Sequence, residues 1–83
     1  MKPSIDEVAQ FVRARISRRT RVPEAEIADA TILVDIGLES VDAVLICGEI
    51  EDAFQVEVEP SVMFEHDSFG AVVDAVMALF EDR

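Results

Sequence analysis

Residues 35–54 read "DIGLESVDAVLICGEIEDAF", and this stretch decides the fold. From Ser40 onward, apolar residues recur at spacings of three and four, which predicts an amphipathic helix over residues 40–54. Ser40 is a good N-cap, and an acid follows it in the first turn. The stripe that we expect to face the core consists of Ala43, Ile46, Cys47, Ile50 and Phe54. A second, shorter apolar stripe contains Val41, Leu45 and Gly48.

Two further segments show the same helical periodicity. Residues 4–19 open with the capping-box spacing S-x-x-E and close with Arg18 and Arg19, which suit the negative end of the helix dipole. We therefore interpret the arginine cluster as structural rather than as a nucleic-acid patch. Residues 68–80 predict the last helix, with Asp67 or Ser68 as its cap. The expected core residues are Ile5, Val8, Ala9, Val12 and Ile16 in the first helix, and Phe69, Val72, Val73, Val76 and Phe80 in the last.

The segments between the helices are less regular. Residues 20–39 form a long, apolar connection in which a short turn begins at Pro23, and "TILV" (31–34) could instead be a strand. "FQVEVEP" (54–60) alternates apolar and polar residues, which is a strand signal, and "PSVMFEH" (60–66) predicts one short helical turn. Two short isolated strands would be marginal. An all-α bundle of three long helices and a short one is the simplest architecture.

Composition limits the domain count and the kinds of partner. The chain has 83 residues, so we expect residues 1–83 to form a single domain. The net charge is −11, and residues 22–82 contain 16 of the 18 acids but no Lys or Arg. Such a field repels nucleic acid and anionic membrane and favours partners with basic patches. The N-terminus lacks the apolar run of a signal peptide and no apolar stretch is long enough to span a bilayer, so we expect a cytoplasmic protein.

The sequence offers little for catalysis. His66 is the only histidine and Cys47 the only cysteine, so neither a disulfide nor a cysteine- or histidine-rich metal site is available. We expect His66 at the surface or at a hinge and Cys47 in the core. The acids do not match the ligand spacing of an EF-hand, and no glycine loop that would cradle a phosphate is present. We predict neither catalytic residues nor a metal site, and we do not expect an enzyme.

Residues 33–76 resemble the acyl carrier protein family. The family's D-x-G-x-D-S-L-like signature reads here Asp35-Ile36-Gly37-Leu38-Glu39-Ser40-Val41, and an acidic helix follows it. "FQVEVEP" stands where the family has a loop, so the resemblance favours a loop over a strand there. "MFEHDSF" looks like the junction between the family's third and fourth helices. The resemblance implies a four-helix bundle of acyl-carrier type, with a short helix III and a long loop between helices I and II.

The resemblance also implies a function. Ser40 would carry a 4′-phosphopantetheine arm from coenzyme A, installed by a phosphopantetheinyl transferase, and the arm's thiol would hold an acyl group as a thioester. The implied partners are acyl-chain synthases, acyltransferases or ligases with basic docking patches, and we expect a monomer. Fatty acyl, polyketide and aminoacyl cargo all stay open. The rival hypothesis is a small acidic adaptor that binds a basic protein and has no prosthetic group, in which Ser40 is only a helix cap.

The chain departs from the family pattern at three positions near the serine. Glu39 replaces the usual Asp, Val41 replaces the usual Leu, and Leu45 replaces a Glu that many fatty-acid carriers have. These departures indicate a specialised carrier whose docking relies more on apolar contacts, unless Val41 and Leu45 simply pack against the loop or helix III. Gly48 costs a helix about 1 kcal/mol and would permit close approach of another element or a partner. The expected docking residues are Glu39, Val41, Asp42, Leu45, Gly48, Glu49, Asp52 and Met63.

Overall fold

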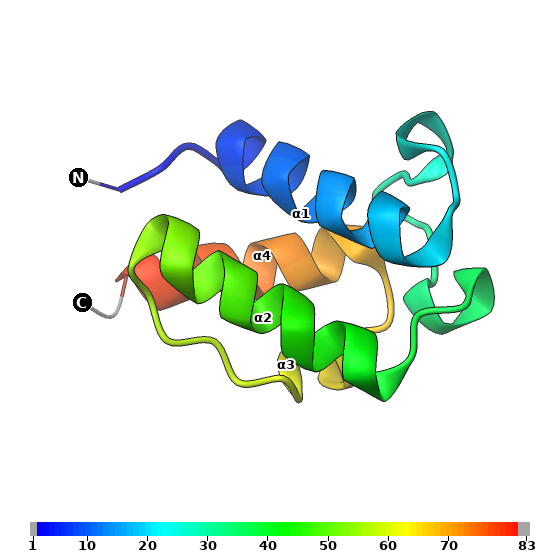
Figure 1. Cartoon of the computed structure of the whole chain (residues 1–83). Helices are drawn as coiled ribbons and strands as arrows, with labels where there is room; N and C mark the ends of the chain where they lie inside the picture. Colours follow the sequence, from blue (N-terminus) through cyan, green and yellow to red (C-terminus); the bar gives the residue numbers. More distant parts are fainter. Residues whose placement is uncertain (1, 82–83) are drawn as a thin grey trace.

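The computed structural model describes residues 2–81. It contains four α-helices: α1 (Ile5–Thr20), α2 (Ser40–Phe54), α3 (Val62–Glu65) and α4 (Phe69–Glu81). The long helices α1, α2 and α4 lie along one another, and the short α3 packs against α4 (Figure 1). An ion pair between Lys2 and Glu81 ties the two ends of the described chain together. The predicted all-α bundle with a short third helix is confirmed.

Helix α1 begins at its predicted cap, Ser4, and ends at Thr20, one residue beyond the predicted range. The Ser4 hydroxyl accepts from the Glu7 N–H at 3.1 Å, and the Glu7 carboxylate accepts from the Ser4 N–H at 3.1 Å, which completes the capping box. The expected core residues Val8, Val12 and Ile16 are fully buried. Ile5 is 49% exposed, so its predicted place in the core is wrong. The buried stripe begins one turn later, because a helix end is covered by fewer neighbours than its centre.

The long connection packs as part of the core. A 3₁₀ turn, η1 (Glu24–Glu26), follows Pro23 as predicted, and a second one, η2 (Leu33–Ile36), replaces the alternative strand "TILV". Only one isolated bridge forms there among residues 2–81, between Ile32 and Ser68. It joins the connection to the start of α4 and leaves no strand. The apolar residues that this connection buries are Ile27, Leu33 and Leu38.

The alternating segment after α2 is a loop and not a strand. Val56 and Val58 are buried, whereas Gln55, Glu57 and Glu59 are exposed, so the period of two is real. No second strand pairs with this segment within the described residues, and its backbone is held by α2 instead. The strand signal is therefore wrong, and the loop implied by the family resemblance is confirmed.

Helix α4 supplies the largest share of the core. All five residues predicted for its apolar stripe are buried, with Phe69, Val72 and Val76 fully so. Phe54 at the end of α2 lies between Phe11 and Phe80, with ring centroids 5.2 and 6.3 Å away in edge-to-face geometry. These contacts join α1, α2 and α4, and they hold α2 firmly in place while its first turn stays at the surface.

Candidate functional site

Ser40 is the first residue of α2, and it is exposed. The chain reaches it through η2 and Gly37, whose φ of 93° lies in the left-handed region that favours glycine. Leu33 and Leu38 on either side of this turn are buried, and the Leu38 N–H donates to the Leu33 carbonyl at 3.2 Å. The serine therefore follows a turn that is anchored in the core on both sides.

Ser40 is not the cap of α2, which corrects the sequence prediction. Glu39 has an extended backbone (φ −106°, ψ 169°), and its carbonyl accepts from the Ala43 N–H at 3.1 Å, so the helix begins directly after it. The Asp42 carboxylate accepts from the Glu39 N–H at 3.0 Å. Because Glu39 and Asp42 form the cap, the Ser40 hydroxyl takes no part in it and remains available for modification.

The other serines are less suited to carry a group. The hydroxyls of Ser4 and Ser68 accept from backbone N–H groups at the starts of α1 and α4. Ser17 is half-buried in the middle of α1, and Ser61 precedes a helix of a single turn. Ser40 combines exposure with the N-terminus of a long helix. Free N–H groups and the helix dipole at such an end favour a phosphate.

Most of the predicted docking residues lie on α2 and extend from Glu39 beside Ser40 to Asp52 in its last turn. Val41 and Leu45 are 61% and 42% exposed, so neither side chain is covered by the loop or by α3, and both leave apolar surface open to a partner. Glu49 forms an ion pair with Arg15 at 3.6 Å and is therefore partly neutralised. Among the other predicted docking residues, Glu39 and Asp52 are exposed, whereas Asp42, Gly48 and Glu49 are half-buried.

Met63 is the exception, because it is only 1% exposed. Its predicted contribution to docking is wrong, since α3 turns this side chain into the core and presents Phe64, 43% exposed, in its place. A helix of four residues gives too short a pattern to show which side faces inward. Val44, 54% exposed, was also missed, although its spacing of three from Val41 places it on the same side of α2.

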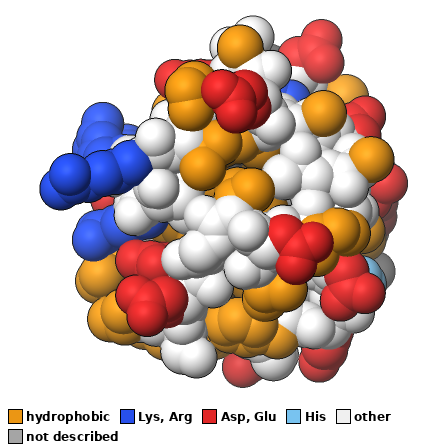
Figure 2. Space-filling model, turned by 90° about the vertical axis from the view of Figure 1, so that its right-hand side faces the viewer, with side chains coloured by type: hydrophobic (Ala, Val, Ile, Leu, Met, Phe, Trp, Pro, Cys, Tyr) orange, Lys and Arg blue, Asp and Glu red, His pale blue; other side chains and the backbone are white. Residues whose placement is uncertain are grey.

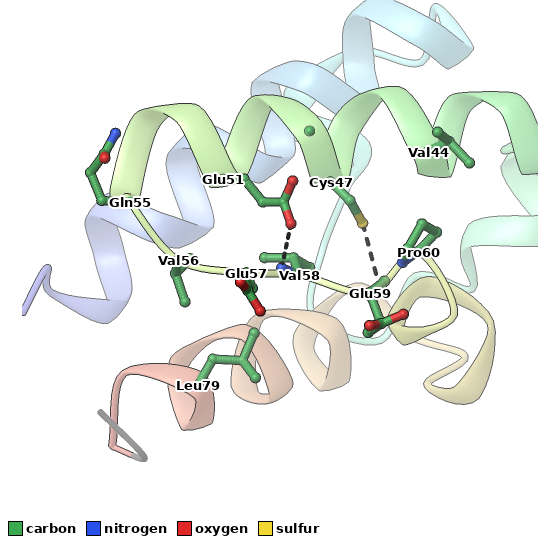
Figure 3. Close-up of a pocket in the computed structure, with 11 residues that line it drawn as sticks. Val44, Cys47, Glu51, Gln55, Val56, Glu57, Val58, Glu59, Pro60 and Leu79 are labelled. Atoms are coloured by element: carbon green, nitrogen blue, oxygen red, sulfur yellow. Dashed lines mark hydrogen bonds between the residues drawn. The ribbon is translucent and has the colours of Figure 1, made fainter.

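A groove lies between α2 and residues 55–60, with Leu79 of α4 at its base (Figure 3). It has a volume of about 1100 Å³ and begins at Val44, one turn after Ser40. The Glu51 carboxylate accepts from the Val58 N–H at 2.9 Å, which holds the loop across the groove. Gly48 leaves the α2 side hollow, because nothing lies within 4 Å of the position that a Cβ would occupy. The alternative that Gly48 admits another element of this chain is therefore wrong.

Cys47 is buried as predicted, and it is an unreactive thiol. It is 1% exposed and its Sγ lies 3.8 Å from the Glu59 carbonyl. Burial, and secondarily the charge of Glu51, raises the pKa of this thiol to about 11. His66 is half-buried at the end of α3, at the junction with α4. Within residues 2–81 no three His, Cys, Asp or Glu side chains gather as metal ligands would.

A family model described as "Phosphopantetheine attachment site" matches residues 10–76. The chain belongs to this family. Its members hold 4′-phosphopantetheine covalently on a serine, so the protein is a phosphopantetheine-dependent carrier and not an enzyme. The family implies that the carrier interacts with a phosphopantetheinyl transferase and with synthases. In the described part of the chain, no helix is long and apolar enough to cross a bilayer.

Two solved structures show the same fold as this carrier. A free-standing peptidyl carrier protein from an uncharacterised secondary metabolic pathway of Acinetobacter baumannii superposes with a TM-score of 0.81 at 20% identity, over 90% of this chain and 94% of that one. The HMG-ACPI domain of the CurA module from Lyngbya majuscula gives a TM-score of 0.78 at 18% identity, over 99% and 89%. No curated protein matches the carrier.

Proposed function

We propose that Ser40 is the residue that carries the phosphopantetheine arm. The observation that carries this proposal is the free, exposed hydroxyl at the first position of α2, whose capping is done by Glu39 and Asp42. When bound, the arm supplies a thiol that holds the cargo as a thioester. The residues of this chain position the arm and need no base beside Ser40, because the transferase supplies the catalysis.

The cargo belongs to specialised biosynthesis in the cytoplasm, as an aminoacyl or polyketide-type acyl group. The peptidyl carrier and the HMG-ACPI domain named above support this assignment, and so does Leu45 in place of an acid on the docking helix. The family match favours the carrier over the rival acidic adaptor, which has no support in the comparisons.

The groove beside α2 is suited to shelter the apolar part of the cargo. It starts at Val44, which lies about 6 Å along the helix axis from Ser40. Its floor includes Cys47, Val56 and Leu79, and its rim carries acids. A flexible arm on Ser40 can place a cargo chain there between visits to partner enzymes.

Docking is proposed to use exposed residues of α2 and α3. Val41, Val44, Leu45 and Phe64 supply apolar contact area, and Glu39 with Asp52 steers basic partner surfaces. Because Glu49 is paired with Arg15, we expect it to contribute less to steering than its charge alone implies.

The test is intact-mass measurement after incubation with coenzyme A and a broad-specificity phosphopantetheinyl transferase. We expect wild-type protein to gain one arm and Ser40→Ala to gain none. The matched control is Ser61→Ala, which removes another exposed serine and should still gain one arm. Wild-type protein that is folded by circular dichroism and gains nothing would favour the adaptor.

A further inference from the structure

The basic side chains of α1 divide into two groups. The Arg13 Nε donates to the Ile27 carbonyl at 2.9 Å, and its guanidinium lies 4.7 Å above the Phe69 ring. Arg15 lies 4.6 Å above the Phe11 ring and pairs with an acid of α2. Both are half-buried and belong to the packing of the bundle.

Arg18 and Arg19 differ from these two. They are exposed, and no Asp or Glu among residues 2–81 comes within 4 Å of either guanidinium. Lys2, another exposed cation, is already paired with Glu81. Arg18 and Arg19, together with the exposed Arg21 just beyond the end of α1, are therefore guanidinium groups without an acidic partner among residues 2–81, on an otherwise strongly acidic protein.

The two arginines lie beside the proposed docking surface of α2. Helices α1 and α2 run in opposite directions (Figure 1), and the Arg15–Glu49 ion pair fixes which turns face each other. Arg18 and Arg19 follow Arg15 by one turn on the same side of α1. Leu45 precedes Glu49 by one turn on the same side of α2. The arginines and Leu45 therefore flank each other at the end of the bundle where α2 begins.

Figure 2 views the molecule from that end. One basic patch projects at its edge, and acidic and hydrophobic side chains lie directly beneath it. Acids are scattered over the rest of this face. This surface thus places basic, acidic and apolar side chains next to one another, whereas a uniformly acidic carrier would have no basic patch there.

We propose that Arg18 and Arg19, the arginine flank, form a second docking site that binds an acidic patch on a partner enzyme while α2 contacts the rest of that enzyme. This inference rests on the proposed function in one respect, which is that the arm and its cargo are attached at Ser40. Arginine beside exposed apolar side chains is the composition of interface centres, and its planar guanidinium suits a carboxylate. The partner therefore has acidic residues next to the basic or apolar patch that meets α2.

Other occupants fit the charges less well. Nucleic acid and anionic membranes are repelled by a net charge of −11, and so is a second copy of this chain. Stabilisation of the α1 dipole needs any cation in the last turn, so it does not require arginine or a place beside α2. The arginine flank also repels enzymes whose docking surfaces are uniformly basic, so such enzymes are disfavoured as partners.

The experiment measures kcat/KM for loading of the holo-protein. The probe is the acyl- or aminoacyl-activating enzyme that, among those encoded in the same genome, loads wild-type holo-protein with the highest kcat/KM. We expect R18Q/R19Q to lower this value about tenfold, mainly through KM, because two charge-assisted contacts are lost. R18K/R19K keeps both positive charges and should recover most of the lost kcat/KM. K2E changes the net charge by the same amount at the other end of α1 and should leave kcat/KM unchanged.

Four outcomes would overturn the proposal. The first is that R18Q/R19Q is loaded with the same kcat/KM as wild type. The second is that K2E lowers kcat/KM as much as R18Q/R19Q does, which would show a general effect of net charge. The third is that R18Q/R19Q lowers kcat/KM for the broad-specificity transferase as much as it lowers loading. That result would place the defect at Ser40 or in the fold. The fourth is a wild-type dimer in sedimentation that R18Q/R19Q abolishes, which would make a second copy the occupant. Failure of the carrier function itself appears separately, as wild-type protein that gains no arm.

Discussion

Ser40 and Cys47 lie seven residues apart on α2 and have opposite surroundings. Ser40 is exposed, and Cys47 is 1% exposed with its thiol pKa raised to about 11 by burial and by Glu51. In the holo-protein the arm would bring a second thiol with an ordinary pKa. With the arm on Ser40, the carrier would keep its two thiols apart, and only the thiol of the arm would be exposed to reagents.

This separation predicts selective alkylation. With iodoacetamide at pH 8, folded holo-protein should gain one label quickly, on the arm. Cys47 should react about 100-fold more slowly than an ordinary thiol, because so little of it is thiolate. Denatured protein should gain two labels, and Cys47→Ala should gain one in either state. Equal rates for both thiols in folded protein, followed by mass spectrometry, would contradict the buried environment of Cys47.

The same shift gives the pH dependence of stability a definite sign. A neutral buried thiol has a raised pKa in the folded state, so its contribution is fully present below pH 9 and lost as the pH rises toward 11. Thermal melts should show wild type losing more stability than Cys47→Ala across this interval. Parallel losses in the two proteins would contradict the assignment.

Single residues were predicted well where a chemical signature marked them. The exposure of Ser40 and the burial of Cys47 follow from spacing and from the family signature. The cap of α2 was mispredicted because serine is a favoured cap residue and glutamate is not, whereas the extended backbone of Glu39 makes it the cap. Met63 was misplaced because its helix is one turn long, which is shorter than a reliable periodic pattern.

At the scale of elements, α2 contains a glycine that the fold itself does not need. Nothing lies within 4 Å of a Cβ built on Gly48, and it lines the groove. Gly48→Ala should therefore raise the free energy of unfolding by about 1 kcal/mol, or the Tm by about 4–8 °C, because alanine is the better helix former.

Gly70 supplies the matched control for this prediction. A Cβ there would lie 3.0–3.2 Å from the Cβ, carbonyl oxygen and Cα of Asp29, so Gly70→Ala should lower stability. Thermal melts of the two variants should thus move in opposite directions. A fall in Tm for Gly48→Ala would show that the position is packed rather than hollow.

The elements also show what periodicity can and cannot predict. The 3.6-residue repeats predicted α1, α2 and α4 with most of their core residues, since each helix buries one side against the others, and Ile5 is the exception in α1. The period of two in residues 54–60 corresponds to the burial of alternate side chains, and the segment does not pair with a strand in the described residues. Whether an extended segment pairs depends on a neighbour elsewhere in the chain, which local pattern does not contain.

At the scale of the whole molecule, three of the large hydrophobic side chains that stay exposed, Val41, Val44 and Leu45, lie in the first two turns of α2. Leu45 is the test of the apolar part. Leu45→Glu should fold normally, because the side chain is 42% exposed, and should lower kcat/KM for loading by the cognate activating enzyme about tenfold, because an apolar interface anchor is lost. Ile5→Glu, at a residue 49% exposed in the first turn of α1, is the matched control and should have no effect. Unchanged kinetics for Leu45→Glu would remove it from the docking surface.

The proposed carrier function depends on where the arm is attached, and peptide fragmentation of the modified protein measures this directly. After reaction with coenzyme A and the transferase, fragment masses should place one phosphopantetheine on Ser40. Attachment at Ser4, Ser17, Ser61 or Ser68, or no attachment to folded protein, would contradict the account.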